Sequence, residues 1–432
     1  MAEPRVLVLA EAANPEWTSV PLVGWSHYRA IANKVDAHLV THVRNAEAIG
    51  RAGLVEGKDF TAIDSERLAA PLWRIGQRIS RWLGLGATLT QAINVATYYY
   101  YERLVRKEFS ARLRAREFDI VHRLTPLSPV IPSLFAKHCH SMGVPFVWGP
   151  INGGVPWPRG FGDVQRKEGE ILSYVRGLHR LLPGHRSTRK NAAAILVASQ
   201  IAMGEIPPYA RDRAVYLPEN AIAPELFSNP VNGPVRTPLR AVTVGRLVPL
   251  KGIDMLLEAA GPLLGNGSLV LDVVGDGPER GNIEKLARSV CSTDAVTFTG
   301  SIPHAEVADR LGRSDVFVFP SVRDFGGGAV LEAMALGLLP IVVDYAGPSE
   351  LVTNESGILI PLGSRAEIVA GLRAALTGLV ADPSTIRQMG GGARERVMSL
   401  FTWEKKAAQT HEIYRWVLGE RGKPDFGMPL CQ

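Results

Sequence analysis

Short runs of aliphatic and β-branched residues alternate along the chain with longer stretches whose apolar residues recur at helical spacing. This alternation is typical of parallel sheets with helices on both faces. In the first half, the pattern predicts strands at residues 5–10, 37–43, 118–122, 145–149 and 192–199. The pattern then begins again, with strands at 239–246, 269–277, 295–300, 315–320 and 339–345, and helices that include 252–260, 280–290 and 304–313.

The restart of the pattern predicts an α/β protein with two Rossmann-like, doubly wound domains. A chain of 432 residues is also too long for one hydrophobic core. Prolines interrupt the periodicity near residues 216–227, and residues 228–238 read as a surface loop. We therefore expect a first domain over residues 1–215 and a second over residues 216–402. Because doubly wound sheets bind ligands at the carboxyl ends of their strands, we expect the site in a central cleft that both domains face.

The composition is ordinary for a soluble globular protein, with 46% apolar and 21% charged residues. The three cysteines, Cys139, Cys291 and Cys431, have no metal-ligand spacing, and such a sparse number favours a reducing compartment. The first residues lack the pattern of a signal peptide, and no apolar run approaches the length of about 18 residues that a membrane span needs. We therefore expect a cytoplasmic protein.

The net charge of +6 is unevenly distributed. Residues 71–116 hold nine Arg and Lys against two Glu, and residues 159–190 hold eight against three acids. In the first segment these cations are interleaved with apolar and aromatic residues, namely Leu72, Trp73, Ile75, Ile79, Trp82, Leu83, Leu85 and Tyr98–Tyr101. This mixture favours peripheral contact with an anionic membrane surface. A plain solvated basic surface is the alternative, and no motif supports binding to nucleic acid.

The stretch PSVRDFGGGAVLEAMALG, residues 320–337, joins a predicted strand to a predicted helix through three glycines. Glycines at a helix start leave backbone amides open to a ligand, and the helix dipole there favours an anion. Asp324 and Glu332 flank this loop, and carboxylates beside a bound phosphate are suited to accept hydrogen bonds from hydroxyl groups. Phosphate together with hydroxyls indicates a nucleotide sugar. The alternative is a tight turn followed by an ordinary solvated glutamate.

A second stretch, GRLVPLKG at residues 245–252, also follows a predicted strand. Arg246 and Lys251 stand five residues apart across a turn that contains proline. A planar guanidinium and a compact ammonium together could neutralise a diphosphate. The alternative interpretation is that they are two unrelated cations in a surface loop.

Six motifs, in order, resemble the retaining glycosyltransferases of family 4, which belong to glycosyltransferase group 1 and have the GT-B fold. The motifs are ENAIAPELF (219–227), VGRLVPLKGID (244–254), VVGDGPER (273–280), FTGSIPHAEV (298–307), the two acids at 324 and 332, and DYAGPSELV (344–352). The resemblance covers residues 216–352. It implies a hexosyltransferase with a UDP- or GDP-linked donor, which retains the anomeric configuration and needs no metal or other cofactor.

The resemblance also implies roles for single residues on the donor side. Arg246 and Lys251 match the basic pair that holds the donor diphosphate, and Glu332 matches the glutamate that bonds the donor ribose. Asp324 stands near the transferred sugar, where the family usually has Glu. The amides of the helix start, at Gly327, Gly328 and Ala329, would face the distal phosphate and the sugar, and Ile302 matches the loop beside the nucleobase.

The first half of the chain matches the family less closely. The glycine-rich loop after the first strand is reduced to LVGWSHY, residues 22–28, in which Gly24 would face the donor. The family usually has a histidine near the end of the fourth strand, a place that His122 would fill, with His27 as its rival. A buried histidine that only completes a hydrogen bond is the alternative. The predicted helix at 403–418 would cross back onto the first domain, which would then include residues 403–420.

These features together predict the function. We expect Asp324, Glu332 and His122 to be the catalytic candidates in transfer of a hexose to a hydroxyl of a saccharide or lipid-linked acceptor, in polysaccharide or glycoconjugate biosynthesis at the inner face of the cytoplasmic membrane. The cations and the helix start would stabilise the departing diphosphate, and no carboxylate cluster suggests a metal site. Two alternatives are transfer to a soluble small acceptor and a non-catalytic partner subunit that binds the nucleotide sugar.

Overall fold

The computed structural model describes residues 3–83, 86–168, 178–291 and 293–427. Its contacts divide the chain into two compact units. The first unit consists of Met1–Gly154, Gly169–Glu219 and Trp403–Gly427, and the second is formed by Val155–Glu168 and Asn220–Thr402. The division after Glu219 lies four residues beyond the predicted limit at residue 215. The segment 155–168, which we had assigned to the first domain, packs with the second unit instead.

The first unit has a parallel sheet of seven strands in the order β3-β2-β1-β4-β5-β6-β7. The strands are β1 (Arg5–Ala10), β2 (Asp36–His42), β3 (Phe60–Ile63), β4 (Ile120–Thr125), β5 (Phe146–Ile151), β6 (Ala194–Val197) and β7 (Ala214–Tyr216). In the register of the central strands, Val8 pairs with Leu39 on one side and with His122 on the other. All five predicted strands are present, and the structure adds β3 and β7 at the two edges.

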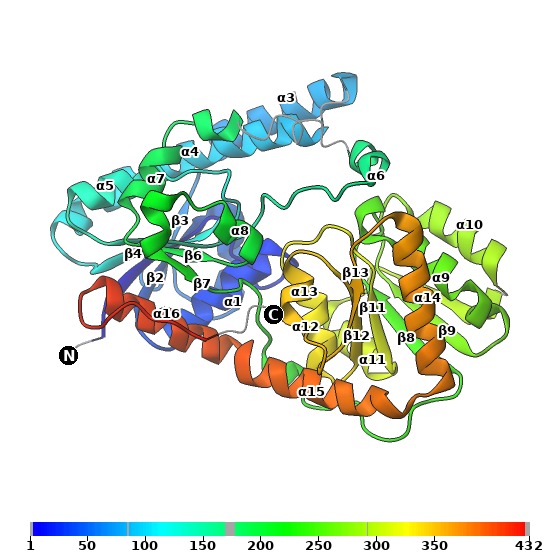
Figure 1. The fold of residues 1–432 in the computed structure, drawn as a ribbon. Helices are drawn as coiled ribbons and strands as arrows, with labels where there is room; N and C mark the ends of the chain where they lie inside the picture. The colour runs from blue at the N-terminus through cyan, green and yellow to red at the C-terminus, as the bar shows by residue number, and fades with distance from the viewer. Residues whose placement is uncertain (1–2, 84–85, 169–177, 292, 428–432) are drawn as a thin grey trace. The chain divides into compact units, whose positions relative to one another are not determined.

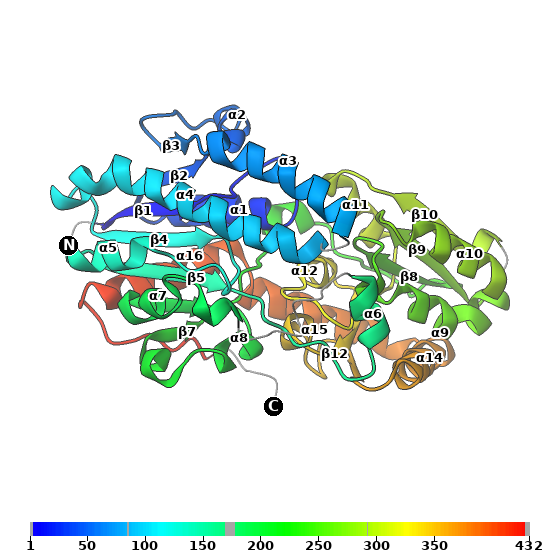
Figure 2. The ribbon, with the colours of Figure 1, turned by 90° about the horizontal axis from the view of Figure 1, so that it is seen from above.

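Helices cover both faces of this sheet (Figure 1). They are α1 (Val20–Ala32), α2 (Ala46–Arg51), α3 (Glu66–Leu83), α4 (Gly86–Arg114), α5 (Phe135–Ser141), α7 (His185–Asn191), α8 (Gln200–Gly204) and α16 (Trp403–Val417). The alternation of β1 explains the two layers: Val6 and Val8 pack against α1 and α16, whereas Leu7 and Leu9 belong to the core under α4 and α5. Helices α3 and α4 lie side by side (Figures 1 and 2).

The second unit has a parallel sheet of six strands in the order β10-β9-β8-β11-β12-β13. The strands are β8 (Leu239–Val244), β9 (Leu269–Val274), β10 (Val296–Gly300), β11 (Val316–Phe319), β12 (Leu339–Asp344) and β13 (Ile358–Pro361). The five predicted strands are again present, and the additional strand, β13, lies at an edge. Both units are therefore doubly wound α/β structures, as predicted.

The helices of the second unit also form two layers. They are α6 (Gly162–Lys167), α9 (Ile253–Gly265), α10 (Arg280–Val290), α11 (His304–Gly312), α12 (Gly328–Ala335), α13 (Gly347–Leu351), α14 (Arg365–Ala381) and α15 (Ser384–Leu400). Helices α9, α10 and α14 bury one face of the sheet, and α11 and α12 bury the other. Helix α14 begins at a capping box, in which Ser364 and Glu367 satisfy each other's amides. Within the described residues, no helix is long and apolar enough to cross a bilayer.

Candidate functional site

The loops that follow β8 and β11 lie together at the carboxyl edge of the second sheet, because these two strands are neighbours. Both the amide of Val322 and the hydroxyl of Ser321 donate to the carbonyl of Leu250, at 3.0 and 3.2 Å. These bonds join the two stretches singled out in the sequence, GRLVPLKG and SVRDFGGG. Residues that are 73 positions apart in the chain, Lys251 and Asp324, thereby become neighbours.

Lys251 and Asp324 form an ion pair in which the lysine ammonium donates to Oδ2 of the aspartate. Both side chains are largely buried, with exposed fractions of 19% and 17%. The ammonium also lies 4.7 Å from the centroid of the Phe319 ring, where the face of an aromatic ring attracts a cation. The second carboxylate oxygen of Asp324 accepts from the amide of Phe325 at 2.8 Å. This pair is the charged centre of the candidate site.

Arg246 follows the carboxyl end of β8 and is exposed. Its guanidinium has no ion-pair partner among the residues that the structure describes. Its carbonyl accepts from the amide of Val248 at 3.0 Å, which shapes the turn toward Lys251. An exposed cation beside a partly buried one could bind an anionic ligand at this edge of the sheet.

Helix α12 begins directly after the glycine-rich loop. Gly327, its N-cap, has φ +62° and ψ +37°, in the left-handed region that a glycine adopts without strain. The amides of Val330 and Leu331 donate to the carbonyl of Gly327, at 2.9 and 3.3 Å. The preceding amides, those of Gly328 and Ala329, stand at the helix start, where an α-helix offers no acceptor of its own. The local geometry on which the anion prediction depends is therefore present.

Glu332 lies one turn into α12, and its Oε1 is 2.8 Å from Nε2 of His304 at the start of α11. The hydrogen bond to this carboxylate raises the pKa of His304 above its ordinary value. His304 was not predicted as a site residue, although it lies within the FTGSIPHAEV motif. Ile302, from the same motif, packs partly buried against the core around α11 and α12. The hydrogen bond between His304 and Glu332 thus connects the candidate ribose contact to the loop expected beside the nucleobase.

His122 lies within β4 and is completely buried. Its Nε2 is 2.7 Å from the carbonyl of Gly149, which can only accept, so this nitrogen carries the proton. Its Nδ1 then accepts from the Tyr414 hydroxyl at 2.6 Å. Burial lowers the pKa of His122 to about 4, so the ring is neutral at neutral pH. Both ring nitrogens thus hold β4, β5 and α16 together, which matches the alternative of a buried histidine that completes hydrogen bonds.

His27, the rival histidine, lies on α1 and is also completely buried. Its Nε2 is 3.2 Å from the Thr410 hydroxyl on α16, and its Nδ1 has no hydrogen-bond partner within the described part of the chain. Burial, together with the nearby His122, lowers its pKa well below the ordinary value. The two histidines therefore form part of the packing between α16 and the rest of the first unit.

Gly24 requires a correction, because LVGWSHY is not a loop. Residues 22–28 all lie inside helix α1. A Cβ added to Gly24 would approach the carbonyl oxygen of Ala12 to 2.2 Å, so the glycine permits close packing of the helix on the chain after β1. Its proposed contact with the donor has no support in this local geometry.

Two residues of the Tyr98–Tyr101 run, which we had assigned to a membrane-facing surface, belong to the core, whereas Tyr99 and Tyr100 are half-buried. Tyr98 and Tyr101 are buried, and the Tyr101 hydroxyl donates to the carbonyl of Val40 at 3.0 Å. The Tyr99 hydroxyl donates to the carbonyl of Pro183 at 2.6 Å. The side chains of residues 75–91 lie outside what the structure describes, as do residues 169–177. The prediction made for those parts remains untested.

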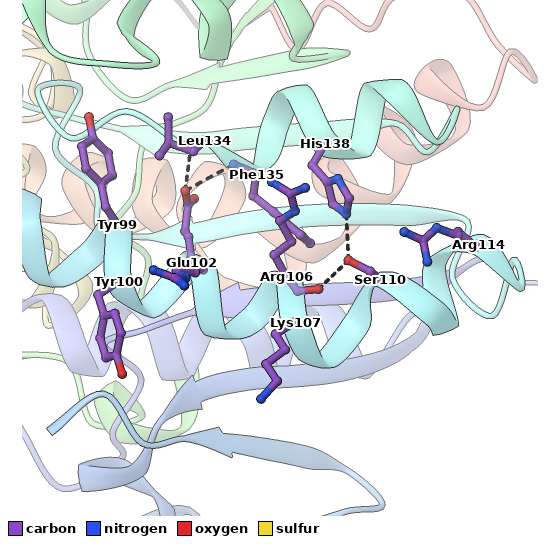
Figure 3. Close-up of a pocket in the computed structure, with 11 residues that line it drawn as sticks. Tyr99, Tyr100, Glu102, Arg106, Lys107, Ser110, Arg114, Leu134, Phe135 and His138 are labelled. Carbon is purple, nitrogen blue, oxygen red and sulfur yellow. Dashed lines mark hydrogen bonds between the residues drawn. The ribbon is translucent and has the colours of Figure 1, made fainter. Parts of the chain in front are cut away.

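A groove of about 750 Å³ lies between α4 and α5 in the first unit (Figure 3). Four cations line it, namely Arg103, Arg106, Lys107 and Arg114. The acid in its lining, Glu102, is buried and accepts from the hydroxyl of Ser133 and from the amides of Leu134 (2.7 Å) and Phe135 (3.3 Å). Burial raises the pKa of Glu102. The exposed charge of the groove is therefore positive.

The described residues contain no group of three or more His, Cys, Asp or Glu side chains that could hold a metal ion. Lys251 and Asp324 form a simple pair, as do His304 and Glu332. The chemical groups that gather at the edge of the second sheet are thus cations, a helix start and single carboxylates.

Most of the second unit resembles a known protein family. Residues 228–395 match the family model of the glycosyl transferases group 1. The chain is 32% identical over 185 residues to an MMP alpha-(1->4)-mannosyltransferase of Mycolicibacterium hassiacum, which covers 43% of this chain and 44% of that protein. It is also 32% identical over 183 residues to a D-inositol 3-phosphate glycosyltransferase of Streptomyces bingchenggensis, covering 39% of each. The chain thus matches less than half the length of these two curated relatives.

Solved structures resemble the chain over nearly its whole length. A sucrose-phosphate synthase from Thermosynechococcus elongatus matches with a TM-score of 0.62 and 19% identity, covering 97% of this chain and 100% of that one. Anabaena Alr3699/HepE, solved in complex with UDP, matches with a TM-score of 0.62 and 13% identity, covering 94% and 98%. The fold is therefore GT-B, and the second unit carries the group 1 glycosyl transferase domain.

Proposed function

We propose that the protein is a retaining, metal-independent glycosyltransferase that moves a hexose from a nucleoside-diphosphate sugar to an acceptor hydroxyl. The observation that carries this proposal is the meeting of Lys251, Asp324 and the start of α12 at one edge of the second sheet. The cation and the helix dipole suit a diphosphate, and the carboxylate suits the hydroxyl groups of a sugar. A UDP-linked donor is favoured over GDP, because a structural neighbour was solved with UDP.

The proposed chemistry follows from these groups. Negative charge grows on the diphosphate as the bond to the sugar breaks, and Arg246, Lys251 and the start of α12 would stabilise it. Glu332 would accept from the ribose hydroxyls, with His304 holding its carboxylate in place. His122 is buried and fully bonded, so the acceptor proton would pass to an oxygen of the departing phosphate instead. Attack from the face that the diphosphate leaves would retain the anomeric configuration.

The first test is thermal stability against UDP, GDP, ADP, dTDP and their common sugars. A ligand at about 100 times its Kd stabilises a native protein by about 2.7 kcal/mol, which is readily measured. We expect one nucleotide series to stabilise the wild type, and Glu332→Gln and Arg246→Ala to reduce that response. Arg373→Gln is a matched control, because Arg373 bonds carbonyls of Glu258 and Ala259 on α9. An equal response in all four proteins would contradict this donor site.

The acceptor is proposed to be a saccharide or a lipid-linked saccharide, as in polysaccharide or glycoconjugate synthesis. Transfer to a soluble small molecule is the alternative, and the name of the inositol-phosphate relative favours it. A non-catalytic partner subunit that only binds the nucleotide sugar is the third possibility. Turnover by the purified protein would eliminate that third possibility.

If the acceptor is lipid-linked, we propose that the protein works at the inner face of the cytoplasmic membrane. It would contact anionic lipid through the groove between α4 and α5. Arg103 and Lys107 lie one turn apart in its lining and are exposed. Each cation near an anionic surface contributes about 1 kcal/mol of attraction, which salt weakens. Loss of two cations, about 2 kcal/mol together, should therefore make the double variant Arg103→Gln/Lys107→Gln bind anionic vesicles about 30-fold less well at low salt.

The control for this experiment is Lys285→Gln/Arg288→Gln, which removes the same charge from exposed positions of α10 in the second unit. Co-sedimentation should be unchanged for the control and absent with vesicles of neutral lipid. A wild-type protein that stays in the supernatant with anionic vesicles at low salt would rule out membrane contact.

A further inference from the structure

Residues 155–168, here called the strap, precede the second unit's main segment by more than 50 positions in the sequence, yet they pack within it. Phe161 is 2% exposed and belongs to the same core as Leu247 and Ile253. Trp157 and Val164 pack partly buried against that core. Helix α6, within the strap, lies against the turn Pro249–Lys251. The strap is therefore an integral part of the second unit.

The strap bonds three loops at the carboxyl edge of the second sheet. The carbonyl of Val155 accepts from Nε of Arg323 at 3.0 Å, in the loop after β11. The carbonyl of Pro156 accepts from the Tyr345 hydroxyl at 2.7 Å, in the loop after β12. The carboxylate of Glu168, at the far end of the strap, accepts from the amide of Leu250 at 3.1 Å, in the loop after β8.

Two of these anchor points adjoin the charged centre of the site. Leu250 immediately precedes Lys251, and Arg323 immediately precedes Asp324. The Arg323 guanidinium carbon lies 4.7 Å from the Trp157 ring centroid and 5.5 Å from that of Phe325. The strap and the residue after Asp324 thus both contact this arginine. The strap therefore bonds to both of the loops that carry the ion pair of Lys251 and Asp324.

Such an anchor has a physical reason in the sequence of the loop itself. Asp324 and Phe325 are followed by Gly326, Gly327 and Gly328. Consecutive glycines lose more conformational entropy on ordering than other residues, so this loop has little rigidity of its own. Contacts from a separate segment of chain can supply what the loop lacks.

We propose that the strap is a positioning element of the donor site, with Trp157 and Arg323 as the positioning residues that hold Asp324 against Lys251. This inference rests on the proposed function. It adds that the strap affects donor binding by holding the ion pair of Lys251 and Asp324 in place. The proposal implies that two parts of donor recognition are independent. Binding of the diphosphate and sugar depends on the strap. The ribose contact at Glu332 does not depend on the strap, because His304 holds it.

The test compares Trp157→Ala with Trp157→Phe, which keeps an aromatic face for Arg323. Arg323→Gln is the second positioning variant, and Arg373→Gln is again the control. The measured quantities are kcat/KM for the donor sugar and the Kd values of the matching nucleoside diphosphate and monophosphate. Displaced catalytic groups cost up to about 100-fold in rate. We expect kcat/KM to fall about tenfold in Trp157→Ala and Arg323→Gln, with Trp157→Phe close to wild type. Monophosphate affinity should stay unchanged throughout.

Amide hydrogen exchange of residues 250–252 and 321–326 provides a readout that does not require activity. We expect faster exchange there in Trp157→Ala, and wild-type exchange in Trp157→Phe and Arg373→Gln. Wild-type exchange and kinetics in Trp157→Ala would overturn the proposal, as would an equal loss of monophosphate and diphosphate affinity. If the wild type binds no nucleotide, the proposed function fails. Exchange alone then decides whether the strap positions these loops.

Discussion

Replacing Lys251 with methionine should lower kcat/KM for glycosyl transfer by about 10²–10³-fold, the range seen when one preorganised charge-stabilising group is lost. Two effects act in the same direction. The departing diphosphate loses a cation, and Asp324 is left as an uncompensated, largely buried carboxylate that repels it. Methionine keeps most of the length of the lysine stem, so the packing against Phe319 should change little.

The two effects can be separated with Asp324→Asn. If the unpaired carboxylate contributes to the loss, Lys251→Met/Asp324→Asn should be more active than Lys251→Met alone, which a double-mutant cycle measures. Lys285→Met on α10 is the control for removal of a lysine from the same unit. Activity within about threefold of wild type in Lys251→Met would remove Lys251 from the proposed donor site.

Replacing Asp315 with alanine should destabilise the second unit by about 1.5–3 kcal/mol, the usual worth of hydrogen bonds to a charged group. Asp315 has no exposed side-chain surface. Its carboxylate accepts from Arg236 at 3.0 Å, from Arg387 and from the amide of Arg240 at 3.1 Å. Its removal leaves two partly exposed guanidinium groups without the charge that balances them, and the amide of Arg240 without its acceptor.

Urea unfolding, followed by amide hydrogen exchange at β8 and β11, measures this loss within the second unit. Asp254→Ala is the matched control, because Asp254 pairs with Arg365 at 3.0 Å but is 47% exposed. Exposed pairs contribute about 0–1 kcal/mol, so the control should unfold nearly as the wild type does. Equal stability of Asp315→Ala and Asp254→Ala would show that the buried network contributes nothing.

The interior strands were predictable from the sequence, whereas three of the four edge strands were not. Central strands of a parallel sheet are buried on both faces, so runs such as RVLVLA consist almost entirely of aliphatic residues. The three missed strands, β3, β7 and β13, are all at edges and are three or four residues long. One of them, ILIP, also ends in proline. An edge strand pairs on one side only, so its composition is less constrained.

The candidate site was predictable as separate motifs and not as a set of contacts. Local spacing placed Arg246, Lys251 and Asp324 in loops after strands, and Glu332 in the helix that follows the glycine-rich loop. It could not show that Lys251 pairs with Asp324, or that His304 pairs with Glu332, because the order of strands in the sheet decides these contacts. The bonding of His122 was not predictable for the same reason. Its partner Tyr414 lies 292 positions away in the chain.

Up to Gly427, the chain passes between the units at four points, after Gly154, Glu168, Glu219 and Thr402. No single cut therefore separates the units, and a fragment that ends at Glu219 would carry Phe161 without its core and His122 without Tyr414. Engineering a chimaera with another donor specificity would accordingly require exchange of 155–168 together with 220–402, with α16 left in place. A graft of 220–402 alone would combine the donor loops of one protein with the strap of another.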